Sequence, residues 1–321
     1  MRKRTKRKIA LFVVLFALAF VIGSIMGWIP ENVGGWVKRI LPASVTSTVS
    51  DAVETAKDKI SAIGESGLDR LKTVYNDYAS AQDETAATRV RGLEIPSCVK
   101  GHQVVAHEGY TLSYNEQYEQ PDWVAYVLTV DELNANNTSR TEDFREDPAI
   151  TTGSAHLDDY RNSGYDRGHL CPSADRTATV EENSETFYLS NMSPQNHRFN
   201  AGLWLKAEGA VRDAARQYGT LYVVTGPVFT EGMKTIGDCK VAVPESFYKV
   251  LLVVTENGSA YAIGMICPQE YEQGNLKPYL CTVDQVEAVT GLDFFPDLED
   301  SIETKAESSY DVTKWPSAFG K

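Results

Sequence analysis

The amino-acid sequence predicts an α+β fold with a largely antiparallel central sheet, preceded by an N-terminal transmembrane helix. First, short runs rich in β-branched and aromatic residues recur between residues 104 and 267, without the regular strand–helix alternation of a parallel sheet. Second, residues 9–29 form an apolar run without any charge. The composition, 42% apolar and 23% charged, is typical of a globular protein.

The N-terminal segment combines a basic flank, residues 1–8, with the apolar run of residues 9–29. A helix of that length rises roughly 30 Å, which matches the core of a bilayer. Basic flanks stay in the cytoplasm, so we expect a single-pass signal anchor that places the rest of the chain outside, in the periplasm or extracellular space. A signal peptide cleaved after Ala17-Leu18-Ala19 is the alternative. We favour the anchor because the apolar run continues beyond that site, and the basic flank argues against a buried core helix.

The remaining chain divides by composition into two parts. Residues 30–92 are rich in small and charged residues and poor in aromatic ones, so we interpret them as a partly helical stalk or linker. Residues 93–321 form the expected globular domain. Its predicted strands alternate or run apolar, and they cover residues 104–107, 110–114, 123–130, 221–229, 247–254 and 260–267.

Turn and capping signals place the other expected elements. Asn257-Gly258 predicts a tight hairpin turn between the last two strands. Residues 200–218 carry apolar residues at helical spacing. Thr282 with Gln285 predicts a capping box that opens a helix ending at Gly291. The acidic segment 297–307 is interpreted as a solvated end.

Charge and cysteines narrow the class of protein. The net charge of -13 opposes binding of long nucleic acids, so such binding would need a local basic cleft. Cations near the polar motifs that could form one are Arg145, Arg161, Arg167, Arg176, Arg198 and Lys206. The five cysteines include no CxxC pair, which argues against a zinc cluster. Their odd number leaves at least one unpaired in a monomer, and any pairing of the others is open.

A histidine and several amides carry the chemical signal. The run Tyr165-Asp166-Arg167-Gly168-His169-Leu170 places an imidazole, suited to take a proton near neutral pH, two residues after an arginine. Asn191 follows, and then Asn200 and Glu208, which are a little over two helical turns apart and can share one side of a helix. Amide and carboxylate oxygens suit magnesium. These groups are what metal-assisted hydrolysis of a phosphodiester requires.

With these residues the chain resembles the DNA/RNA non-specific endonucleases, the ββα-metal nucleases that include endonuclease G. The resemblance covers about residues 93 to 295 and rests on separated motifs in the family's order. These motifs are Phe144-Arg145-Glu146-Asp147, Asp159-Tyr160-Arg161, the Asp166–Leu170 run, Phe187-Tyr188-Leu189-Ser190-Asn191, Pro194-Gln195 and Asn200, Trp204 and Glu208. It implies a ββα-metal fold and an Mg²⁺-dependent endonuclease, with Mn²⁺ as a substitute, that cleaves DNA and RNA with little sequence specificity and leaves 5′-phosphate ends.

The resemblance also implies residue roles. His169 corresponds to the general base that activates water, Asn200 to the residue that binds magnesium directly, and Glu208 to the carboxylate that holds water bound to the metal. Arg145 and Arg167 correspond to arginines that face the phosphate. Asn191 corresponds to a supporting amide of the active site, and family members often form homodimers.

Departures from the family and two rival functions accompany this interpretation. Cys171 and Pro172 stand where the family often has alanines, and Ala201 stands where it often has glutamine.

One rival function is a phosphodiesterase acting on another substrate, which the acidic composition favours. The other is a membrane-tethered interaction domain that has lost turnover, which the intact set of polar residues disfavours.

Overall fold

The computed structural model describes residues 92–97, 99–255, 257–271 and 274–320. The expected basic flank, membrane anchor and stalk therefore lie outside the described residues, apart from residue 92. Every helix within the described ranges is too short or too polar to cross a bilayer.

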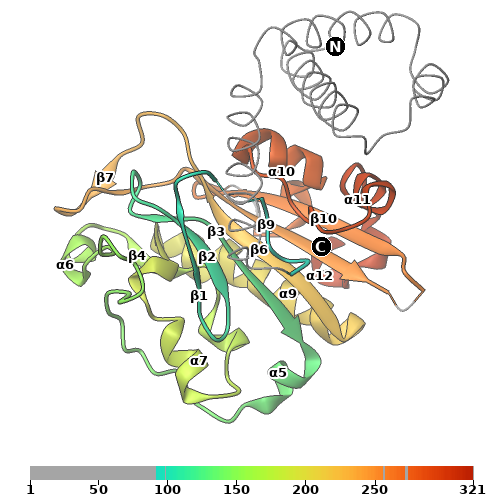
Figure 1. The fold of residues 1–321 in the computed structure, drawn as a ribbon, viewed down its shortest axis with the longest axis horizontal. Coiled ribbons are helices and arrows are strands. Elements are labelled where there is room, and N and C mark those ends of the chain that lie inside the picture. Colours follow the sequence, from blue (N-terminus) through green and yellow to red (C-terminus); the bar gives the residue numbers. More distant parts are fainter. Residues whose placement is uncertain (1–91, 98, 256, 272–273, 321) are drawn as a thin grey trace, which may run out of the picture. The chain divides into compact units, whose positions relative to one another are not determined.

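A seven-stranded sheet forms the centre of the described region, in the order β1-β2-β3-β6-β9-β10-β11 (Figure 1). Every pair of neighbouring strands in it is antiparallel, which confirms the predicted α+β class. Its strands are β1 (Gln103–Ala106), β2 (Thr111–Asn115), β3 (Gln120–Thr129), β6 (Thr220–Val228), β9 (Ser246–Val254), β10 (Ala260–Pro268) and β11 (Leu280–Cys281). The first six of these were predicted; β11 was not.

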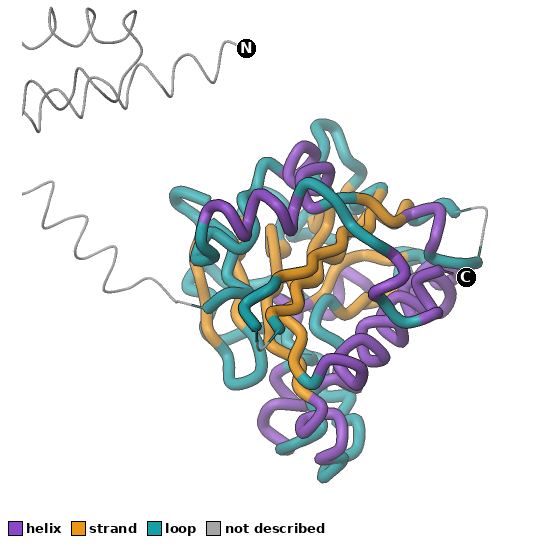
Figure 2. The backbone as a smooth tube through the Cα atoms, turned by 90° about the vertical axis from the view of Figure 1, so that its right-hand side faces the viewer, coloured by secondary structure: helices purple, strands orange, loops and turns teal. Residues whose placement is uncertain are grey.

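Helices cover both faces of this sheet (Figure 2). Side chains alternate along a strand, so Phe247 and Leu251 of β9 pack in one core with α9 (Leu205–Tyr218). Tyr248 and Val250 point to the other face. There they join the core beneath α10 (Val283–Thr290) and α11 (Asp300–Glu307).

The predicted helix over residues 200–218 is present, but it does not start as a regular α-helix. It follows the single turn α8 (His197–Phe199) and opens with a π-helical turn, Asn200–Trp204, before α9. Trp204 is fully buried, as is the apolar face of α9. Gly219 ends the helix with φ 83°, a conformation that glycine adopts without strain.

Two other local predictions are confirmed, and one is wrong. Thr282 caps α10 through a capping box with Gln285, and Gly291 ends it in the left-handed region. Gly258, at φ 80°, donates its N–H to the Thr255 carbonyl in the predicted hairpin turn. The acidic segment 297–307, however, is not merely a solvated end: most of it is α11, whose Ala306 and Glu307 are buried.

Shorter elements complete the described region. Two small antiparallel sheets pair β4 (Asp166–His169) with β5 (Met192–Gln195) and β7 (Thr235–Ile236) with β8 (Val241–Ala242). The remaining helices are α5 (Val130–Ala135), α6 (Leu157–Tyr160), α7 (Val180–Glu185) and α12 (Ser317–Gly320). Single 3₁₀ turns lie at Ser173–Asp175, Leu189–Asn191, Lys277–Tyr279 and Val312–Lys314.

Candidate active site

The site is built on β4, β5 and the helix that follows them, a ββα unit. His169 ends β4 opposite Met192 of β5. The chain then turns at Asn196, whose side chain accepts the N–H of Phe199 and so caps the start of the helix. Trp204 donates its indole N–H to the carbonyl of His169 at 3.1 Å, which ties the helix to the end of β4. The fold thus ties the strand that ends at His169 to the helix that carries Asn200, although neither strand was predicted.

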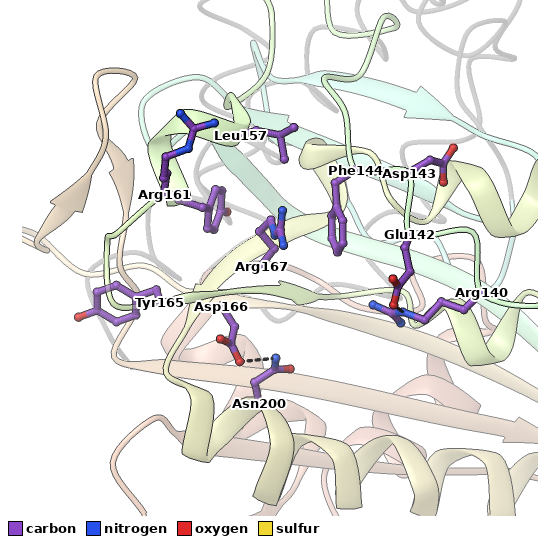
Figure 3. A pocket seen from close by; sticks show the side chains of 11 residues that line it. Arg140, Glu142, Asp143, Phe144, Leu157, Arg161, Tyr165, Asp166, Arg167 and Asn200 are labelled. Atoms are coloured by element: carbon purple, nitrogen blue, oxygen red, sulfur yellow. Dashed lines mark hydrogen bonds and ion pairs between the residues drawn. The ribbon is translucent and has the colours of Figure 1, made fainter.

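An open cleft of about 770 Å³ lies over this unit (Figure 3). Its lining is rich in charge. The lining residues are Arg140, Glu142, Asp143, Phe144, Leu157, Tyr160, Arg161, Tyr165, Asp166, Arg167 and Asn200. Figure 3 shows that Arg167 comes from β4 and Asn200 from the helix, and both residues line the cleft. Of the cations predicted to form a basic cleft, Arg161 and Arg167 line it, and Arg140 joins them. The lining is not basic overall, because Glu142, Asp143 and Asp166 balance the three arginines.

The His169 imidazole is buried beside this cleft between aromatic rings. Only 8% of the residue is exposed, and its ring centroid is 5.8 Å from that of Phe144 and 4.9 Å from that of Phe187. Its Nε2 has no hydrogen-bond partner among the described residues. Burial, with smaller contributions from Arg140 and Arg167, lowers the pKa of His169 to about 3. The imidazole is therefore neutral at physiological pH, the form that can accept a proton.

Asn200 presents an amide oxygen to the cleft. Its Nδ2 donates to Oδ2 of Asp166 at 2.9 Å, so the Oδ1 atom is left for another partner (Figure 3). The same Asp166 oxygen lies 2.9 Å from Nδ1 of the exposed His197. Asp166 therefore holds the side chain that the sequence assigned to the metal. Its role was not predicted, although it stands within the Asp166–His169 motif.

Glu208 lies two turns further along the helix and is only partly exposed. Although part of the residue reaches solvent, burial of its carboxyl raises its pKa to about 7, and the charge of Lys249 opposes that rise. Asp175 adds to the rise because it is a second negative charge nearby. Asp175 forms an ion pair with Arg212 at 2.9 Å. Glu208 thus belongs to a half-buried group of charges behind the cleft.

Lys249 supplies the deepest charge of that group, and the sequence did not indicate it. It is completely buried on β9, where its Nζ lies 4.1 Å from the centroid of the Trp204 ring and 3.2 Å from Oγ1 of Thr225. Burial lowers the pKa of Lys249, and Glu208 and Asp175 oppose that shift. Lys249 forms no ion pair with a carboxylate among the described residues. Burying an ammonium in this way is costly, so its position beneath the helix points to a functional role.

The arginines predicted to face the phosphate differ in position. The Arg167 guanidinium carbon lies 4.0 Å from the centroid of Phe144 on the wall of the cleft. Arg145 points elsewhere: it stacks 4.1 Å from the Tyr188 ring and pairs with Asp143 at 2.7 Å. Arg140, in contrast, donates to Ser173 Oγ at 2.8 Å. The structure brings Arg167 to the cleft and places Arg145 against a neighbouring loop.

Four other predicted residues, Asn191, Arg176, Arg198 and Lys206, lie away from the cleft wall. Asn191 is fully buried, and its side chain is saturated by the backbone: Oδ1 accepts from Cys171, and Nδ2 donates to the carbonyls of Cys171 and Thr186. Arg176 is buried too, donating to the Gly109 and Val127 carbonyls, which corrects its assignment to a basic cleft. Lys206 donates to the carbonyl of Gly274.

Comparison with known proteins identifies relatives of this chain. The family model for the DNA/RNA non-specific endonucleases matches residues 93–301. A nuclease of Nostoc sp. is 36% identical over 213 residues, which cover 63% of this chain and 76% of that protein. The mitochondrial nuclease EXOG of Danio rerio is 32% identical, covering 73% and 72%. A crystal structure of an EndoG/EndoGI complex superposes with a TM-score of 0.58 at 31% identity, covering 62% of this chain and 88% of that one.

Proposed function

This chain belongs to the DNA/RNA non-specific endonuclease family, and we propose that it is a divalent-metal-dependent endonuclease that hydrolyses DNA and RNA with little sequence preference. The observation that carries the chemistry is that one ββα unit carries two side-chain atoms left without a partner in the described part of the chain. Nε2 of His169 has no partner among the described residues, and Oδ1 of Asn200 is turned away from the hydrogen bond to Asp166. A base and a metal ligand are what this reaction needs.

The donor set fits a hard divalent cation. Asn200 Oδ1 and the carboxylates of Asp166 and Glu208 are oxygen donors, which magnesium and manganese accept, and an open cleft leaves room for the water that magnesium retains. Asn200 would hold the ion, with Glu208 fixing its water shell. When bound, the ion would neutralise charge on the phosphoryl oxygens and on the leaving 3′ oxygen.

Residues of the chain supply the general base, the contacts to the phosphate and the positioning of the loop after His169. His169, which is neutral at physiological pH, takes the proton of the attacking water at Nε2. This atom is covered in the structure, so the water reaches it only when neighbouring side chains shift. Arg167 and Arg140 on the cleft hold the phosphate. Asn191 positions the loop after His169 through its bonds to Cys171. We propose products with 5′-phosphate and 3′-hydroxyl ends.

Magnesium-dependent cleavage of nucleic acid tests the proposal. The full-length chain should cut both plasmid DNA and RNA, stop in millimolar chelator, and recover with magnesium or manganese. Its DNA ends should be ligatable without added phosphate. Asn200→Ala should lose most of this activity, whereas Asn257→Ala, the same change in an exposed turn, should not. Full turnover in chelator would contradict the metal dependence.

The acidic composition favours one alternative, a phosphodiesterase on a small substrate. A net charge of -13 repels long polyanions, whereas a small phosphodiester would interact mainly with the arginines of the cleft. Faster hydrolysis of bis(p-nitrophenyl) phosphate than of plasmid, in matched buffer, would support that alternative. Failure on every phosphodiester would support a tethered interaction domain instead.

We further propose that residues 9–29 anchor the chain in a membrane with the nuclease region outside. The uncharged apolar run and the basic flank before it support this topology.

A further inference from the structure

Three acidic side chains converge on the sheet face opposite α9. Asp284 and Glu287 stand one turn apart on α10, and Glu307 is the last residue of α11. One carboxylate oxygen from each lies within 4.8 Å of the others. The two helices pack together at the end of the sheet that lies away from β4 (Figure 1). This cluster is therefore separate from the candidate active site and independent of the function proposed for it.

Glu307 is the unusual member of the cluster. Only 6% of it is exposed, and its Oε1 is a buried atom with no hydrogen-bond partner among the described residues. An unsatisfied buried carboxylate is costly, so something must compensate for it. It also stands at the C-terminal end of α11, where a negative charge opposes the helix dipole. Neither the fold nor the helix thus explains why a carboxylate is retained here.

The surroundings of the cluster are strongly negative. Glu307 lies near four other acids, Glu287, Glu303, Asp284 and Asp293, whose negative charges repel its own. None of the ion pairs observed among the described residues involves these five acids. A cation would remove the repulsion that this arrangement creates.

We propose that Asp284, Glu287 and Glu307 form a binding site for a calcium ion that links α10 to α11. Two oxygens that bind one Ca²⁺ at 2.3–2.6 Å can be about 5 Å apart at most, and the three carboxylates meet that limit. Asp284 is exposed and gives the ion a path from solvent. Glu287 uses Oε1 to accept the N–H of Phe294 at 3.0 Å, which fixes its side chain and leaves Oε2 available.

Calcium fits this site better than magnesium does. Magnesium keeps several waters and requires near-octahedral geometry at 2.0–2.1 Å. The buried Glu307 leaves little room for retained water on its side of the cluster. Calcium tolerates irregular coordination by carboxylates and loses water more readily.

Calcium titration of the full-length chain tests the site. Asn200→Ala serves as the background, because that change removes the ligand proposed for the active-site metal. After chelator treatment, calorimetric titration should show one equivalent of calcium bound. At a hundred times its Kd, calcium should raise the Tm by roughly 5–10 °C, since a ligand that binds only the folded state stabilises it.

Variants assign the binding to these residues. Glu307→Gln, which keeps the shape of the side chain, should abolish calcium binding and the Tm shift. Asp284→Asn, at an exposed position, should weaken calcium binding at least tenfold. If Glu307→Gln does not fold, this variant tests whether the cluster binds calcium. Asp300→Asn, an exposed acid of α11 outside the cluster, should leave binding unchanged.

Three results would overturn the proposal. The first is the absence of a calcium response at 10 mM in the background protein, which would mean that the acids share protons instead. The second is an unchanged response in Asp284→Asn or Glu307→Gln. The third is equal affinity for magnesium, which would contradict the assignment to calcium.

Discussion

Replacing Lys249 by methionine should change the pH dependence of cleavage more than the stability of the protein. Lys249 is buried beneath Trp204, and its charge is the largest influence that holds the pKa of Glu208 down against the effect of burial. That pKa is already about 7. Without the ammonium group it rises further. In the proposed mechanism Glu208 must be ionised to fix the water shell of the cation, so we expect activity to increase as pH rises through the pKa of Glu208.

The magnitude follows from the fraction of Glu208 that is ionised. At pH 7 a group of pKa 7 is about half ionised, whereas a rise of one pKa unit, worth about 1.4 kcal/mol, leaves about a tenth. The Lys249→Met variant should therefore cleave about five-fold more slowly at pH 7 and recover by about pH 9. Stability should change by no more than about 2 kcal/mol, because the lost hydrogen bond and ring contact offset the relief of a buried charge.

The assay is the rate of plasmid cleavage from pH 5.5 to 9.5, with magnesium well below saturation, together with the Tm at each pH. Lys314→Met is the matched control, because Lys314 also lies over an aromatic ring, Tyr261, at 3.6 Å but is exposed. It should leave the profile unchanged. A Lys249→Met profile that coincides with that of the wild type would refute the reasoning.

Other outcomes separate the roles of the remaining groups. Asn200→Asp, which keeps an oxygen donor, should retain more activity than Asn200→Ala at matched Tm; equal losses would argue against a metal ligand. Arg140→Ala should raise KM about tenfold, the order of one charge-assisted hydrogen bond. Arg145→Ala should lower the Tm instead, because Arg145 pairs with Asp143; a KM effect as large as that of Arg140→Ala would restore its assignment to the phosphate. Protease added to intact spheroplasts should digest residues 93–321, and protection would contradict the proposed topology.

The elements that could be predicted from the sequence are those whose own residues show an apolar run, a turn signal or a capping signal. β9 and β10 are apolar runs joined by Asn257-Gly258, and α10 has a capping signal at each end. β4 has no such pattern: Asp166–His169 is polar and contains glycine, and it is a strand because β5 pairs with it. α11 was missed for a related reason, since its buried side is visible only once it packs against α10.

The candidate site was predictable to the extent that its residues lie close together in sequence. The spacing of Asn200 and Glu208 indicated a shared helix face, and the motif around His169 indicated a base. The bond from Asp166 to Asn200 and the charge of Lys249 depend on three-dimensional proximity between segments. The burial of Arg176, which was expected in a basic cleft, depends in the same way on packing that no local pattern encodes.

The central claim is that His169 is the general base of a phosphodiester hydrolysis, and its replacement by alanine tests that claim most directly. Because its pKa is about 3, the imidazole is neutral across the working range and should not itself produce a limb near pH 6.5. In single-turnover cleavage of a short duplex at saturating magnesium and pH 8, His169→Ala should be slower by about 10² to 10⁴. The Tm should remain within a few degrees. A mutant that cleaves within a few-fold of the wild-type rate would contradict the central claim.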